Sequence, residues 1–218
     1  MFRTSARLKS AIILLAALAL GLSGCSLFAP EEGGGGGDDT GGYKERTTCP
    51  NVIHNLTRAY EEMEPEEYVA LLAEDFEFWL NPGDLGDPQN PLPESWGRTD
   101  EATIAENMLG DGTNVLSIQL TLSQLGSAVE IPGPNPGDPS TWQYTYSVDL
   151  YVYLPNDLTY WANAASRYTF QVDPVETGPN GETWWEIIKW EDIDTPTRPV
   201  TPGDFEQVTL TELKALFQ

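Results

Sequence analysis

The first 24 residues combine a basic start with an apolar run. Three basic residues in the first nine positions precede ten apolar residues, 11–20, a run too short for a good membrane span. The small pair Ser23-Gly24 and then Cys25 follow. This order is typical of a bacterial lipoprotein signal, so we expect residues 1–24 to be removed and Cys25 to carry lipid. An ordinary secretory peptide with a coincidental cysteine is the alternative.

Residues 25–47 contain very little that could be buried in a core. Five consecutive glycines, 33–37, lie between two pairs of acidic residues. A stretch of some 20 such residues predicts a flexible lipidated tether with a reach of roughly 25 Å. The function then belongs to a single domain, residues 48–218.

Apolar residues at helical spacing open this domain. A first helix is expected to begin near Pro50, a second at Pro65, and a third at a cap formed by Thr99. The first helix has one apolar stripe, made of Val52, Leu56, Ala59, Tyr60 and Met63. A capping box, Thr209 with Glu212, predicts a short helix at the C-terminal end.

A period of two dominates the middle and the end of the domain. Alternation of apolar and polar side chains predicts strands over 75–80, 114–122, 142–154, 160–172 and 183–190. Helices followed by long antiparallel strands indicate an α+β fold, with the helices packed on one face of the sheet.

Charge and composition exclude several functions. Without its leader the chain has 194 residues and a net charge of about −26, a surface that repels nucleic acid and anionic headgroups. We therefore expect no nucleic-acid partner. The acidic residues are spread along the chain, which is typical of a solubilising surface, while a cationic partner or Ca²⁺ is the alternative. Asp84, Asp87 and Asn90 offer oxygens but lack the ligand spacing of a calcium loop.

Cysteine and histidine are too few for several kinds of site. If Cys25 is lipidated, Cys49 has no partner within the chain, so the fold has no disulfide framework. We interpret Cys49 as a small residue at the start of the first helix. The single histidine, His54, lies on the polar side of that helix, so we predict neither a metal site nor a cofactor.

Three segments of the sequence carry a family resemblance: 55–60 (NLTRAY), 68–78 (YVALLAEDFEF) and 185–192 (WEIIKWED). With the order of elements they resemble the NTF2-like (SnoaL-like) superfamily, in the branch found as bacterial lipoproteins of unknown function. The resemblance covers about residues 49–192. It implies a cone, in which a strongly curved antiparallel sheet wraps around the N-terminal helices and leaves a pocket at its open end.

The resemblance also implies which positions would carry chemistry. The superfamily includes ketosteroid isomerases, in which a tyrosine on the first helix donates to an oxyanion and an aspartate moves the proton; Tyr60 matches that tyrosine. The position of the base falls at Leu80 or Asn81, and neither can take a proton from carbon. Dehydratase-like members use an Asp/His pair, for which only His54 is present. These departures favour a domain without catalysis.

Aromatic residues are the candidates for the pocket lining. We predict that Tyr60, Trp79, Trp96 and Trp190 line it, with ordinary core packing as the alternative for each of them. Trp161 is a further aromatic candidate, for the pocket or for a sugar-binding platform.

The leading hypothesis is therefore a lipoprotein held at the bilayer through Cys25, whose domain binds a small apolar ligand or another envelope protein without catalysis. Ser26, where an aspartate would favour the inner membrane, points to the outer membrane in a Gram-negative cell. The alternative is a cyclase, dehydratase or isomerase that uses Tyr60 and a strand carboxylate such as Asp149. A third hypothesis is an interaction module that forms a homodimer through its sheet.

Overall fold

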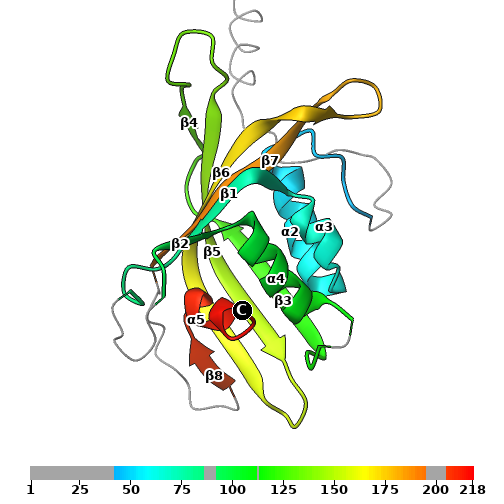
Figure 1. Ribbon diagram of the computed structural model, residues 1–218, viewed down its shortest axis with the longest axis vertical. Helices are drawn as coiled ribbons and strands as arrows, with labels where there is room; N and C mark the ends of the chain where they lie inside the picture. The colour runs from blue at the N-terminus through cyan, green and yellow to red at the C-terminus, as the bar shows by residue number, and fades with distance from the viewer. Residues whose placement is uncertain (1–41, 86–91, 112, 195–204) are drawn as a thin grey trace, which may run out of the picture. The chain divides into compact units, whose positions relative to one another are not determined.

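The computed structural model describes residues 42–85, 92–111, 113–194 and 205–218 (Figure 1). These ranges form one compact unit, which begins at Tyr43. The predicted signal peptide, Cys25 and most of the predicted tether lie outside the described residues, as do Asp87 and Asn90. Among the described residues, no helix is both long and apolar enough to span a bilayer.

Four helices lie in the described part of the domain: α2 (Cys49–Glu62), α3 (Pro65–Val69), α4 (Arg98–Leu109) and α5 (Leu210–Ala215). The helix α2 begins where the sequence predicts it, and the Thr48 hydroxyl accepts the Asn51 amide proton at 3.3 Å. The predicted cap of α4 is wrong. Gly97, not Thr99, is its N-cap, because Gly97 is the last residue of a strand that passes directly into the helix.

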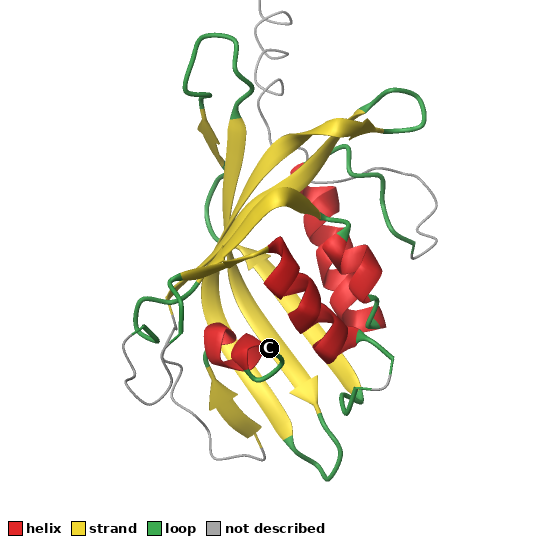
Figure 2. Cartoon of the chain, in the orientation of Figure 1, coloured by secondary structure: helices red, strands yellow, loops and turns green. Residues whose placement is uncertain are grey.

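Within the described ranges, eight strands form one curved sheet: β1 (Leu72–Trp79), β2 (Ser95–Gly97), β3 (Ser117–Gln124), β4 (Val129–Ile131), β5 (Thr141–Tyr153), β6 (Thr159–Thr177), β7 (Thr183–Asp194) and β8 (Phe205–Val208). Their order is β2-β1-β7-β6-β5-β3, while β4 pairs with β5 and β8 with β6. The sheet is mixed, not antiparallel throughout as expected, because β1 pairs with β7 and β6 with β8 in parallel. Irregular register between β6 and β7 accompanies the curvature (Figure 2).

Alternation along β5 separates the two faces of the sheet. Val148, Leu150 and Val152 are buried, whereas Asp149 and Tyr151 point to the other face. The helices α2, α3 and α4 lie along one side of the sheet, as Figures 1 and 2 show. The α+β class predicted from the sequence is confirmed.

The C-terminal helix α5 is held by the predicted capping box. The Thr209 hydroxyl accepts the Glu212 amide proton at 2.9 Å, and the Glu212 carboxylate accepts the Thr209 amide proton at 2.9 Å. Leu210 and Leu213 are completely buried, so this short helix packs into the domain core. It lies against β6, near β8 (Figure 1).

Candidate functional site

Three of the four predicted pocket residues come together between the helices and the sheet. Tyr60 on α2, Trp96 on β2 and Trp190 on β7 are all buried. Phe78 of β1 links the last two, with ring centroids 4.7 Å from Trp96 and 5.5 Å from Trp190. We call the space that these rings enclose the cone interior.

Trp79 lies on the opposite face of the sheet. It follows Phe78 in β1, so its side chain points outward and is 36% exposed. Its indole nitrogen donates to Glu77 at 2.9 Å, and the Lys189 ammonium group lies 4.4 Å from the ring centroid. The structure therefore separates Trp79 from the other three predicted pocket residues.

The cone interior is filled by a lysine from the chain's own C-terminal helix. The Lys214 side chain is completely buried and forms an ion pair with the carboxylate of Glu101, which is also buried. Its ammonium nitrogen lies 4.0 Å from the ring centroid of Trp190 and 4.4 Å from that of Phe78. It also donates to the Tyr68 hydroxyl at 3.4 Å. Lysine and glutamate are almost never fully buried unless they are paired. Here both are fully buried, and they are paired with each other.

Glu101 is the centre of this network. Its Oε1 accepts from both Lys214 and the Tyr68 hydroxyl, and its Oε2 accepts from the Trp96 indole nitrogen at 2.6 Å. Burial and the negative charge of Glu101 raise the pKa of Tyr68 well above its ordinary value. Burial lowers the pKa of Lys214, while the charge of Glu101 acts in the opposite direction. Because both groups are buried away from water, the charge of each is stabilised by the other and not by solvation.

Neither member of this pair is among the predicted site residues, although the sequence pattern contains a signal for both. Glu101 precedes Ile104, Ala105 and Met108 at helical spacings of three, four and seven, so it lies on the buried stripe of α4. In α5, Lys214 follows Leu210 at a spacing of four and is buried with it. A charged residue on an apolar stripe indicates a buried partner of opposite charge.

A second buried acid, Asp192 of β7, anchors α5. Its Oδ2 accepts from the Thr211 hydroxyl at 3.0 Å and from the Thr211 amide at 3.3 Å. Burial raises the pKa of Asp192 to about 6, and the negative charge of Asp84 adds to the rise. The Asn81 amide donates to the Thr211 hydroxyl at 3.1 Å, which ties the end of β1 to the same helix.

The residues that the enzyme hypothesis requires are not brought together. Leu80 is buried, and the Asn81 side-chain oxygen accepts the Gly83 amide proton at 2.8 Å within a turn. Tyr60 lies in the cone interior, whereas Asp149 lies on the other face of the sheet. There Asp149 accepts from Asn163 at 2.5 Å and from Trp161 at 3.4 Å.

The other chemistry-bearing candidates are placed as follows. Cys49 is buried, and burial raises the pKa of its thiol to about 12, so the thiolate needed of a nucleophile is scarce at neutral pH. His54 is half-buried on α2. In the part of the chain that the structure describes, no three histidine, cysteine or acidic side chains are grouped to hold a metal ion.

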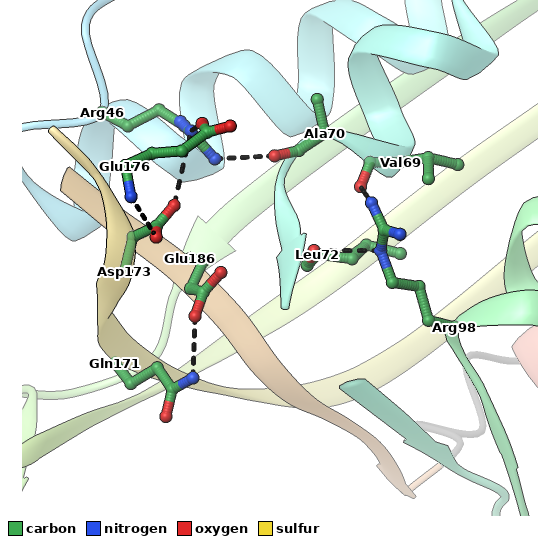
Figure 3. A network of polar contacts seen from close by, with 9 residues as sticks. All are labelled: Arg46, Val69, Ala70, Leu72, Arg98, Gln171, Asp173, Glu176 and Glu186. Atoms are coloured by element: carbon green, nitrogen blue, oxygen red, sulfur yellow. Dashed lines mark hydrogen bonds and ion pairs between the residues drawn. The ribbon is translucent and has the colours of Figure 1, made fainter. Parts of the chain in front are cut away.

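A polar cleft of about 730 Å³ opens outside the cone interior, beside β1, β6 and β7. Two arginines and five carboxylates line it. Figure 3 shows both arginines and three of the carboxylates, Asp173, Glu176 and Glu186. Arg46 donates to the Ala70 carbonyl at 2.6 Å and to Glu176 at 2.7 Å. Arg98 donates to the Leu72 and Val69 carbonyls, both at 3.2 Å. Both arginines thus hold the junction of α3 and β1 and fix the shape of the cleft.

Glu186 lies deeper in the same cleft. Its carboxylate accepts from Gln171 at 2.7 Å, and burial raises its pKa above the ordinary value, with the negative charges of Asp173 and Asp75 adding to the rise. Glu74 and Asp75 on β1 are exposed. The sequence pattern gave no sign of this cleft, because its lining comes from segments far apart in the chain.

No protein-family model matches the chain, and no curated protein matches it. Solved structures that it resembles include a conserved protein from Planctomyces limnophilus (12% identity, TM-score 0.46, 66% of this chain and 91% of that one). A second is an NTF2-like protein with a cystatin-like fold from Novosphingobium aromaticivorans (16% identity, TM-score 0.39, 68% of this chain and 80% of that one). A third is a Δ5-3-ketosteroid isomerase from Mycobacterium sp. (15% identity, TM-score 0.40, 68% of this chain and 92% of that one).

At these identities, and with TM-scores below 0.5, the likeness carries no argument about the activity of this chain. The order of elements and the curved mixed sheet agree with the cone that the sequence resemblance implies. The described part of residues 43–218 is an α+β domain with a curved mixed sheet, and the chain's own Lys214 occupies its interior.

Proposed function

We propose that the chain is a membrane-anchored bacterial lipoprotein whose NTF2-like domain binds a ligand or an envelope protein at its surface, without catalysis in the cone interior. The observation that carries the proposal is the buried pair of Lys214 and Glu101, which occupies the place where a substrate would lie.

A substrate could enter the cone interior only at a high energetic cost. It would have to displace Lys214 from Glu101 and from the faces of Trp190 and Phe78, leaving a buried carboxylate without its counter-ion. Removal of one partner of a buried ion pair typically costs about 3–5 kcal/mol. Leu80 and Asn81, at the position of the isomerase base, offer no group that could accept a proton from carbon.

The outer cleft is a candidate binding surface for such a domain. Its carboxylates and arginines favour a polar ligand or a polar protein segment over the apolar ligand expected from the sequence. Arg46 and Arg98 hold the walls through backbone carbonyls, so the cleft exists before a partner binds. A cleft formed in advance lowers the ordering cost of binding.

Substitution Cys25→Ser should release the protein from membranes. The serine variant cannot take the thioether-linked lipid, and without acyl chains the acidic domain has little affinity for an anionic bilayer. In cell fractionation followed by mass spectrometry, we expect wild type in the membrane pellet with the mass of a lipid-modified chain beginning at Cys25. The variant should be soluble and lack that modification.

Cys49→Ser is the matched control, since it removes the other cysteine of the chain and should leave the protein in the membrane pellet. A Cys25→Ser protein that stays in the pellet, or a wild-type chain without lipid mass, would contradict the anchoring.

A further inference from the structure

We propose that the cone interior is a binding site for a primary ammonium group and that Lys214 occupies it as an intramolecular ligand. When the Lys214 side chain is absent from it, the same site can take the amine of another molecule. This inference concerns the interior alone and stands whether or not a partner binds in the outer cleft.

The surroundings of Lys214 are those of an ammonium receptor. The carboxylate of Glu101 supplies the opposite charge, and its Oε2 is held in place by the Trp96 indole at 2.6 Å. The faces of Trp190 and Phe78 lie within 4.4 Å of the nitrogen, distances at which ring faces attract a cation. A carboxylate and aromatic ring faces together attract a protonated amine, and they do not attract a neutral group of the same size electrostatically.

The receptor keeps polar groups that Lys214 does not use. The Trp190 indole nitrogen and the Tyr168 hydroxyl are buried and find no hydrogen-bond partner among the described residues. The two rings are neighbours, with centroids 4.7 Å apart. Buried donors are normally paired, so these two indicate capacity for an acceptor group on a ligand that α5 does not supply.

Lys214 reaches the receptor from α5, a short helix whose Leu210 and Leu213 pack into the core. Thr211 binds Asp192 and Asn81, and Thr209 donates to Asp84 at 2.7 Å. The ammonium group is thus presented by α5 and not by the sheet or by α2 and α4. Removal of the Lys214 side chain alone vacates the receptor, while Leu210, Leu213 and Thr211 still hold α5 in place.

The full chain with Cys25→Ser and Lys214→Ala tests the site directly, because alanine removes three methylenes and the nitrogen, the equivalent of n-propylamine. In thermal unfolding with added propylammonium chloride, we expect a saturable rise in melting temperature for Lys214→Ala and none for the chain that keeps Lys214. Propylammonium should bind at least about tenfold more tightly than n-propanol, the advantage expected for a hydrogen bond to a charged group.

Glu101→Gln added to Lys214→Ala removes the charge of the receptor and should abolish the preference for the amine over the alcohol. If Lys214→Ala does not fold alone, propylammonium-dependent folding, followed by circular dichroism, becomes the readout and n-propanol should not replace it. Equal effects of amine and alcohol, or no effect of either, would overturn the proposal.

Discussion

Glu101→Gln lowers the free energy of unfolding by about 3–5 kcal/mol, measured by urea denaturation, because it leaves the buried Lys214 ammonium without its counter-ion. Glutamine has the same shape and can still accept from Tyr68 or Trp96. The loss therefore reports the charge and not a cavity. Lys214→Met should cost a similar amount, since it leaves the Glu101 carboxylate buried alone.

The double variant Glu101→Gln, Lys214→Met should lose much less than the sum of the two single losses, because both buried charges are gone and the methionine keeps most of the packing against the rings. Glu62→Gln is the surface control; it breaks the partly exposed pair with Arg58 and should cost less than about 1 kcal/mol. Additive losses at Glu101 and Lys214 would show that the two side chains are not coupled.

Stability should fall as the pH rises from about 4 to about 6, and Asp192→Asn should remove a large part of this fall. The pKa of Asp192 is raised from 3.8 to about 6, chiefly by burial, so in this range the folded chain binds a proton that the unfolded chain has lost. Such a group favours folding below the window and costs stability above it. A rise of two units corresponds to about 3 kcal/mol at most.

Urea denaturation at pH 4, 5, 6 and 7.5 measures this effect. The stability of Asp192→Asn relative to wild type should increase through the window, because asparagine can still accept from Thr211 and has no charge to bury. Asp111→Asn, at an exposed position, controls for the loss of one negative charge from an acidic protein. A constant difference between Asp192→Asn and wild type across the range would contradict the assignment.

The sequence predicted the parts of the fold that rest on local periodicity. Alternation gave β5 and its buried face, and the Thr209–Glu212 box gave α5. Local sequence signals mislead where contacts between distant segments decide a helix boundary or the direction of a strand. Gly97 is the N-cap of α4 because it ends β2, and β1 lies parallel to β7 because of pairings between segments far apart in the chain.

The site was less accessible to sequence reasoning, because its central pair joins residues 113 positions apart. Glu101 lies in the first turn of α4, where an acidic side chain is favourable in any case, but its position on the apolar stripe decides its role. The sequence predicts Tyr60, Trp96 and Trp190 as pocket-lining aromatics, and the structure places all three among the buried residues. Lys214, which fills that interior, was missed because a lysine near a helix end is usually a solvent-exposed charge.

The burial of Lys214 is the central claim, and reductive methylation of the native Cys25→Ser chain, followed by peptide mass spectrometry, tests it most directly. Exposed Lys44 and partly exposed Lys189 should be dimethylated, while Lys214 should remain unmodified until the protein is denatured. Methylation of Lys214 in the native protein at the rate of Lys44 would contradict a cone interior filled by the chain's own lysine.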